Sequence, residues 1–238
     1  MIILKKKIEK VYATALTKTF KVINPIKKSI ITTDCEVHLY IQQNALDILK
    51  NEGYDIQYEL FKLYLPQINQ GLVWADQDFK SYHHFYNPKN KKGKYGYEEN
   101  ALILSKRYYN TSLKYFSMDN YKRGMFYFGA ACHIIHDLTI PQHAKGKLLD
   151  NHRQFELYVK ANYKKIKRFK AFDSPILLDT IEDYANHNSF NALELDFMYK
   201  DIKDLNTKFY LTAINSLKLA QRSSAGCMLM LYNDLLFN

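Results

Sequence analysis

The chain has 238 residues, of which 47% are hydrophobic and 24% are charged. This composition supports one sizeable buried core and excludes a disordered tail, a collagen-like repeat and a disulfide-stabilised miniprotein. Because only 8 Gly and 5 Pro are present, there are few places for the tight turns of a β-sandwich or for a linker between domains. We therefore predict one mostly helical domain.

Most of the net charge of +10 lies in the first 28 residues, where eight lysines and one glutamate give +7. Apolar residues recur at helical spacing between these lysines, which predicts a basic amphipathic helix that ends before Pro25. Such a helix could bind peripherally to an anionic membrane surface, and the alternative is an ordinary first helix with a solvated lysine face. We divide the chain into a basic segment, residues 1–28, and a helical domain, residues 29–238.

Two features of the sequence bear on cellular location. The first 25 residues do not resemble a signal peptide, because lysines interrupt the apolar run and no clear cleavage site follows. The three cysteines, Cys35, Cys132 and Cys227, cannot all pair with one another, so no disulfide framework is predicted. We expect a cytoplasmic or peripheral membrane protein, with secretion as the alternative.

Apolar periodicity predicts six further helices, and no strand alternation competes with it. Residues 67–97 form the exception, because they hold glycines and a proline among polar residues and are predicted to be a long loop. Long loops inside compact domains are usually functional. The predicted helices cover residues 36–51, 56–65, 98–116, 120–139, 151–168 and most of 193–236.

Histidine and carboxylate residues recur at metal-ligand spacing in the stretch ACHIIHDLTIPQHA, residues 131–144. His133 and Asp137 are four residues apart, so on a helix their side chains share one face and can reach one cation, whereas His136 lies on a neighbouring face. Pro141 should end this helix and leave His143 on the next turn, beyond the reach of the same ion. A second metal centre is therefore plausible.

The next segment supplies partners for that second centre. His152 and Glu156 are again four residues apart, and with His143 they form a His, His, Glu set typical of a zinc site that keeps one position open for water. The predicted loop adds Asp76, Asp78, His83 and His84, and the helix before it adds His38. A single histidine is more often a surface or hydrogen-bonded residue than a ligand, but seven of the eight histidines cluster in four short segments beside carboxylates.

These motifs resemble those of the bacterial zinc-dependent phospholipase C family, whose relatives include single-strand-specific zinc nucleases. The core of the likeness is the HxxxDxxxPxHA pattern that starts at His133, together with the preceding FYFGAA, residues 126–131, and the following HxxxE that starts at His152. CEVHLYIQQNALDILKNEG (35–53) resembles the family's first ligand helix, GLVWADQDFKSYHHFYNP (71–88) its ligand loop, and SSAGCMLMLYND (223–234) its closing helix.

The resemblance implies an all-α bundle around two or three Zn²⁺ ions. It also implies hydrolysis of a phosphodiester, and for a phospholipid the products would be diacylglycerol and a phosphorylated head group. Asp76 is then the candidate that steers the proton of the attacking water as well as a ligand. By resemblance, one zinc would be held by Asp76, His84, His133 and Asp137, one by His143, His152 and Glu156, and one by His38 and the bridging Asp137.

The sequence departs from the family pattern at the third zinc. In the family, the amino group and carbonyl of an N-terminal tryptophan complete that site, but here the matching position is near Ile26, and the one tryptophan is Trp74. Cys35 stands three residues before His38 and could supply a thiolate instead, with the carboxylates on either side of it as oxygen alternatives. The competing interpretation is a small core residue, which is the more common role of cysteine.

Toxin-type members of the family also carry a membrane-binding β-sandwich for which this sequence has no counterpart, so we expect no potent membrane lysis.

The leading alternative function is that of a nuclease that uses the same metals, in which lysines follow the phosphates and loop aromatics stack on bases. Nucleic acid is the less expected partner, because the short interval from His143 to His152 resembles the phospholipases and the nucleases carry aspartate where Glu156 stands. A third possibility, motivated by the missing tryptophan, is a catalytically inactive, metal-stabilised, membrane-associated protein.

Overall fold

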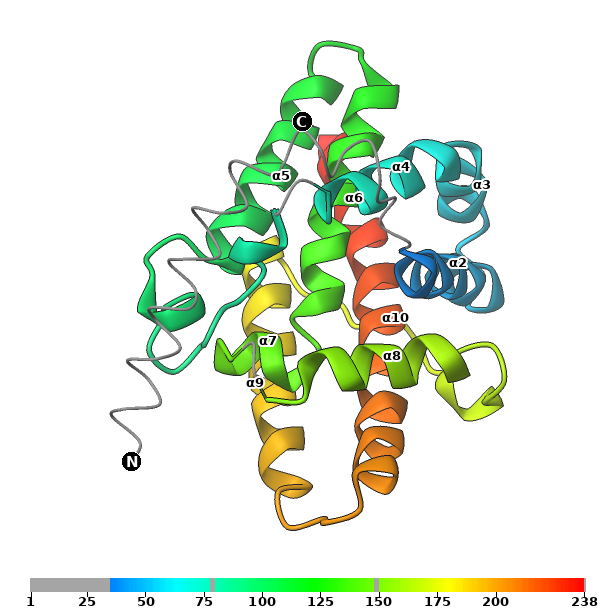
Figure 1. The fold of residues 1–238 in the computed structure, drawn as a ribbon. Helices are drawn as coiled ribbons and strands as arrows, with labels where there is room; N and C mark the ends of the chain where they lie inside the picture. The colour runs from blue at the N-terminus through cyan, green and yellow to red at the C-terminus, as the bar shows by residue number, and fades with distance from the viewer. Residues whose placement is uncertain (1–34, 78–79, 148–149, 238) are drawn as a thin grey trace.

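A computed structural model describes residues 35–77, 80–147 and 150–237 (Figure 1). Within these ranges no β-strand forms beyond an isolated bridge between Asn87 and Lys92, so the predicted all-α fold class is confirmed. The helices are α2 (Glu36–Asn51), α3 (Asp55–Leu63), α4 (Leu65–Ala75), α5 (Ala101–Phe116), α6 (Tyr121–Asp137), α7 (Pro141–Lys145), α8 (His152–Asn162), α9 (Ile181–Met198) and α10 (Leu205–Phe237).

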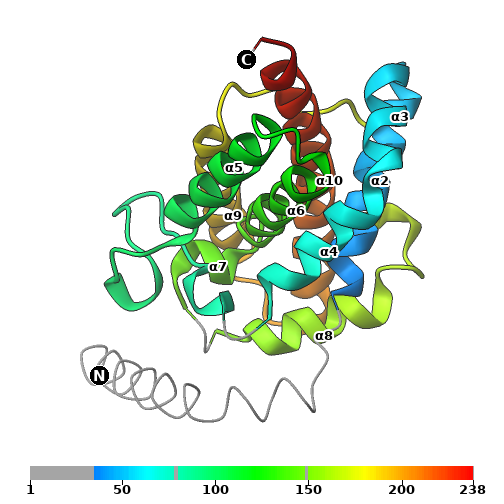
Figure 2. The same cartoon turned by 90° about the horizontal axis from the view of Figure 1, so that it is seen from above.

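Helix α6 lies at the centre of the bundle. It contacts α2, α4, α5, α9 and α10, and Figure 2 shows it between α5 and α9 on one side and α2 and α10 on the other. Every residue from 128 to 139 is buried, including the titratable residues His133, His136 and Asp137 of α6. A helix that is covered on all sides must be apolar all round or must pair its polar groups internally. The buried polar groups of α6 therefore mark a candidate functional site.

Two glycines allow α4 to approach α6 closely. A Cβ atom added to Gly71 would lie 1.8 Å from the carbonyl oxygen of Phe126, and one added to Gly129 would lie 2.1 Å from that of Ile68. Both clashes are with backbone, which cannot move aside as the end of a side chain can. Since Asp76 follows the last residue of α4, this crossing sets its distance from the buried end of α6.

We expect Gly71→Ala to lower the free energy of unfolding by about 2 kcal/mol or more, because overpacking against backbone outweighs the gain of about 1 kcal/mol in helix propensity. Urea denaturation measures this change. Gln70→Ala on the exposed face of the same helix is the matched control and should stay within about 0.5 kcal/mol of the wild type. Equal stability of the two variants would contradict the close crossing.

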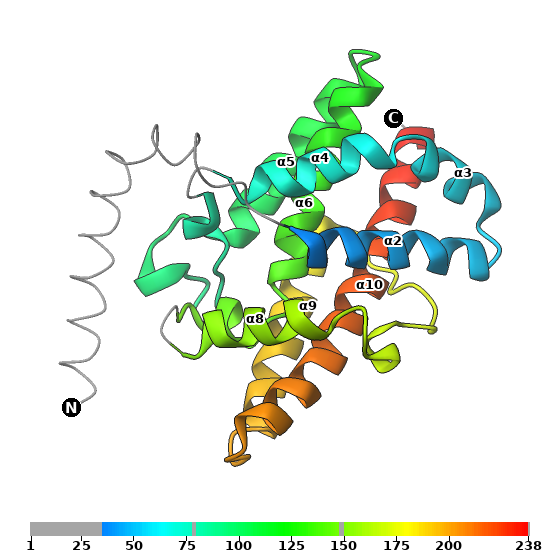
Figure 3. The ribbon, with the colours of Figure 1, turned by 45° about the vertical axis from the view of Figure 1, so that its right-hand side comes forward.

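A second apolar cluster joins α2, α8 and α10. Figure 3 shows α2 and α8 lying side by side across α10. The cluster is separate from the larger core around α6 and forms one wall of the cavity described below. Its buried members are Ile41, Phe155, Val159, Tyr163, Phe169, Phe209, Ala213, Leu217 and Ala220.

Three of the expected boundaries are wrong. Residues 67–75 are the greater part of α4 rather than loop, because Pro66 occupies the first turn of the helix, where its missing N–H costs nothing, and Gly71 serves packing. The helix expected over residues 151–168 ends at Asn162. The last predicted helix is in fact two antiparallel helices, α9 and α10, and residues 181–192 of α9 were not predicted at all. Helix α9 begins where the side chain of Thr180 accepts a hydrogen bond from the backbone N–H of Asp183.

The basic N-terminal helix and the domain boundary at residue 28 lie outside the described residues and stay predictions. Among the residues that are described, no helix is both long and apolar enough to span a membrane.

Candidate metal centre

Four elements bring the predicted ligands together near the C-terminal end of α6. His38 lies in the first turn of α2, and Asp76 directly follows α4. His84 follows a short 3-10 turn, η1 (Lys80–His83), and His133 and Asp137 end α6. Segments almost a hundred residues apart in the sequence thus meet at one point.

The carboxylate of Asp137 is the centre of this group. Its Oδ2 atom lies 2.7 Å from Nδ1 of His84 and 3.3 Å from Nε2 of His133, and its Oδ1 atom lies 3.4 Å from Nε2 of His38. The ring of His38 stacks on that of His133 with a centroid separation of 4.0 Å. Potential ligand atoms of His38, His133 and Asp137 lie within 4.8 Å of one another, and so do those of Asp76, His84 and His133.

A second group of potential ligands lies on α7 and α8. Nε2 of His152 is 2.9 Å from Nε2 of His143 and 3.0 Å from Oε1 of Glu156. Nδ1 of His143 donates a hydrogen bond of 2.7 Å to the backbone carbonyl of His84, so its Nε2 carries no proton and is directed to the group. The structure therefore gathers the histidines and carboxylates of all three predicted zinc sites into two groups.

Burial and charge act against each other on these side chains. Burial by itself would raise the pKa of Asp137, but the positive charge of His133 and His143 and hydrogen bonds from His133 and His84 hold this pKa well below its usual range. Burial lowers the pKa of His143 to about 4. Burial and then the charge of His133 lower the pKa of His38 as well. The lowered pKa values leave His38 and His143 neutral at neutral pH, so that they can offer lone pairs near an ionised carboxylate, whereas the charge of Asp137 and a hydrogen bond to it raise the pKa of His133 despite its burial.

The donor set suits zinc. Imidazole nitrogen and carboxylate oxygen are typical zinc ligands. Nε2 of His84 is buried and has no hydrogen-bond partner among the described residues, and because Nδ1 donates to Asp137, this nitrogen presents an unshared lone pair. In the second group, two imidazole nitrogens face each other at 2.9 Å, and at most one proton can lie between them. A cation would satisfy both groups, so the residues present fit zinc.

Among the described residues, the other candidates are not members of these groups of potential ligand atoms. Cys35 directly precedes α2 and is buried, and its Sγ atom is 3.8 Å from Oδ2 of Asp76 rather than grouped with His38. Its role as a metal ligand stays a prediction. His83 belongs to neither group, Trp74 packs against aromatic rings of α5 and α6, and Asp78 lies outside the described residues.

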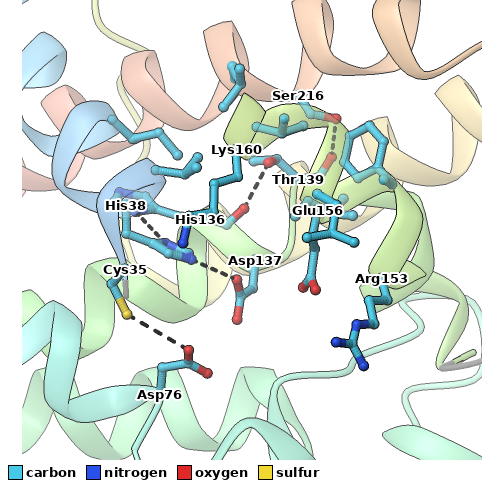
Figure 4. Close-up of a pocket in the computed structure, with 17 residues that line it drawn as sticks. Cys35, His38, Asp76, His136, Asp137, Thr139, Arg153, Glu156, Lys160 and Ser216 are labelled. Carbon is cyan, nitrogen blue, oxygen red and sulfur yellow. Dashed lines mark hydrogen bonds and ion pairs between the residues drawn. The ribbon is translucent and has the colours of Figure 1, made fainter. Parts of the chain in front are cut away.

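A cavity of about 280 Å³ opens beside the metal centre (Figure 4). Members of both ligand groups line it, among them His38, Asp76, Asp137 and Glu156. Burial raises the pKa of Asp76, which makes this carboxylate a better proton acceptor than an ordinary aspartate. The opposite wall is apolar and comes from the second apolar cluster, through Ile41, Phe155, Val159 and Leu217.

Three titratable residues of the cavity were not predicted as site residues. Arg153 and Lys160 are exposed and lie on the same face of α8 as Glu156, so this face presents two cations to the cavity. His136 was assigned to a neighbouring face of its helix, but it also lines the cavity and is 1% exposed. Its position next to Asp137 in the sequence was the available signal, and its surroundings depend on how α2 packs.

Known structures share this fold. The alpha toxin of Clostridium absonum superimposes with a TM-score of 0.69 at 16% sequence identity, and the match covers 85% of this chain and 64% of the toxin. The alpha-toxin of an avian strain of Clostridium perfringens gives 0.68 at 17% identity, over 84% of this chain and 63% of that toxin. The chain thus spans less than two thirds of the length of these toxins. No curated protein sequence matches it significantly.

A comparison with models of protein families identifies the family of this chain. The model described as zinc dependent phospholipase C matches residues 37–223, which include the proposed ligands from His38 to Glu156 and most of α10. The resemblance seen in the sequence motifs is therefore confirmed over most of the chain. This protein belongs to the zinc-dependent phospholipase C family.

Proposed function

We propose that the protein is a phospholipase C that uses two or three zinc ions to hydrolyse glycerophospholipids to diacylglycerol and a phosphorylated head group. The observation that carries this proposal is the position of Asp137. One carboxylate contacts His38, His84 and His133 beside a second His, His, Glu group, and members of both groups face one cavity. Clustered metal ligands of this kind suit the displacement of one phosphate oxygen by another.

In this proposal zinc would be held by Asp76, His84, His133 and Asp137, by His143, His152 and Glu156, and by His38 with Asp137. Bound there, zinc supplies Lewis acidity that polarises a phosphoryl oxygen and lowers the pKa of water. The protein itself orients the reactants. Asp76 faces the cavity and its raised pKa suits it to take the proton of the attacking water.

The rest of the cavity suits a lipid phosphodiester. Arg153 and Lys160 place positive charge where an anionic phosphodiester would approach. The apolar wall formed by Ile41, Val159 and Leu217 fits the glycerol and the first part of an acyl chain, and it limits the access of water. A polar nucleic acid backbone would gain little from this wall.

The test is to incubate the zinc-loaded protein with phosphatidylcholine micelles, with phosphatidylglycerol micelles and with single-stranded DNA. We expect phosphorus NMR to show a phosphomonoester of the head group, with diacylglycerol in the organic phase and no reaction in excess chelator. Release of nucleotides from DNA without lipid turnover would instead support the nuclease. Turnover of neither substrate would support an inactive, metal-stabilised protein.

We also propose that the basic segment, residues 1–28, holds the protein at anionic membranes, which agrees with a peripheral membrane or cytoplasmic location. Deletion of residues 1–24 should weaken cosedimentation with vesicles containing phosphatidylglycerol, and should leave hydrolysis of a soluble phosphodiester unchanged. Because the attraction is between opposite charges, raising the salt concentration should have the same effect on the full chain. Equal cosedimentation of both forms would contradict the anchor.

A further inference from the structure

His136 is a buried imidazole that the proposed ligand set does not use. It stands between His133 and Asp137 on α6, is 1% exposed and lines the cavity beside the metal centre. Figure 4 shows its ring meeting that of His38, which comes from α2. A buried polar side chain costs free energy unless it forms hydrogen bonds with the groups around it.

The two imidazoles meet through like atoms. Nδ1 of His136 lies 3.2 Å from Nδ1 of His38, and the two rings are inclined by 14° with their centroids 5.4 Å apart. On the other side of its ring, Nε2 of His38 lies 3.4 Å from Oδ1 of Asp137. His38 is therefore contacted at both ring nitrogens, by His136 on one side and by the proposed metal site on the other.

One proton must lie between the two Nδ1 atoms, since two bare lone pairs at this distance would repel each other. If the proton belongs to His38, a neutral ring leaves Nε2 of His38 bare and able to bind a cation next to Asp137. If it belongs to His136, a neutral His38 carries its own proton on Nε2, which blocks the metal. Only the arrangement in which His136 accepts the hydrogen bond is compatible with a ligand role for His38.

We infer that His136 is a positioning residue, which accepts the Nδ1 proton of His38 and so keeps Nε2 of His38 bare and aimed at the ion shared with Asp137. In most metal sites, a carboxylate or a backbone carbonyl does this for the ligating histidine. His143 shows the usual arrangement here, because its Nδ1 donates to the carbonyl of His84. The inference rests on the proposed function, because it takes His38 to be a zinc ligand.

Three variants separate this role from simple filling of space. His136→Phe keeps the ring and removes both nitrogens. His136→Asn places a carbonyl oxygen near the position of Nδ1, so it can still accept the hydrogen bond. His187→Phe makes the same exchange at a half-buried histidine of α9, which belongs to neither ligand group among the described residues.

Calorimetric titration of the chelator-treated, full-length variants with zinc should show the effect. We expect His136→Phe to weaken one zinc equivalent roughly 10- to 100-fold and to leave the tighter equivalents unchanged, whereas His136→Asn should recover most of the affinity. His187→Phe should bind as the wild type does. Equal affinities of His136→Phe and wild type, or equal losses in His136→Phe and His136→Asn, would overturn the inference.

A measurement on the wild type tests the same inference without depending on whether a variant folds. Nitrogen-15 NMR of the zinc-loaded protein should show His38 with its proton on Nδ1 and a hydrogen bond from it to His136. A proton on Nε2 of His38 would overturn the inference. If the wild type binds zinc in this way yet hydrolyses no phospholipid, the proposed function fails and the role of His136 stands.

Discussion

Replacement of Asp137 by asparagine should abolish phospholipid hydrolysis, with a fall of roughly 10³-fold or more, because Asp137 is the proposed ligand shared by two ions. The change keeps the size of the side chain and removes its charge. The carboxylate contacts three imidazoles. Burial alone would raise its pKa, but the positive charge of His133 and His143 and hydrogen bonds from His133 and His84 hold this pKa well below its usual range, so the negative charge is present at neutral pH.

Zinc content measured by elemental analysis should fall with activity in the Asp137→Asn variant. The second group, His143, His152 and Glu156, should keep its ion, since none of its ligand atoms is grouped with Asp137. His187→Ala is the control outside both groups, and it should change neither zinc content nor turnover. Comparable losses of zinc and of turnover in the two variants would contradict the ligand assignment.

The metal-free protein should lose stability as the pH falls from about 6.5 towards 4. His143 has a pKa of about 4 when folded and takes the ordinary value when unfolded, so across this window the unfolded chain binds more protons. This difference amounts to about 3 kcal/mol for His143 when the window is complete. The pKa values of His38 and His136 are lowered too and act in the same direction, whereas the raised pKa of His133 acts in the opposite one.

Urea denaturation in excess chelator at several pH values between 8 and 4.5 measures this dependence. His143→Asn removes one of the titrating groups, so it should reduce the loss on acidification by most of the share that belongs to His143. Saturating zinc at pH 8 should raise the free energy of unfolding, because the metal binds the folded form only. A metal-free protein that became more stable on acidification would contradict these pKa shifts.

Local spacing predicted part of the site, and the resemblance to a family predicted the rest. The pairs His133 with Asp137 and His152 with Glu156 follow from the period of the helix, and the break at Pro141 separated His143 from the first pair. No spacing rule brings His38 and His84 to Asp137, because their positions depend on how α2 and the loop after α4 pack. The family and the all-α class are confirmed, and the ligand assignment stays a prediction.

The errors have similar causes. Helix α4 carries a proline and a glycine, which usually indicate a loop, but the proline lies in the first turn and the glycine lies where another backbone passes. His136 was not recognised because its partner, His38, lies on a different helix, and helical periodicity describes only one helix at a time. Tertiary packing decided both cases.

His84 contributes to both ligand groups, through its side chain to one and through its backbone to the other. Its imidazole lies against Asp137, and its carbonyl oxygen accepts the hydrogen bond that orients His143. A small displacement of this one peptide would therefore disturb both groups at once, and an error of about 1 Å in such geometry can cost a large factor in rate. Loss of an ion from one half should therefore shift the ligand geometry of the other, even where the other half keeps its own ion.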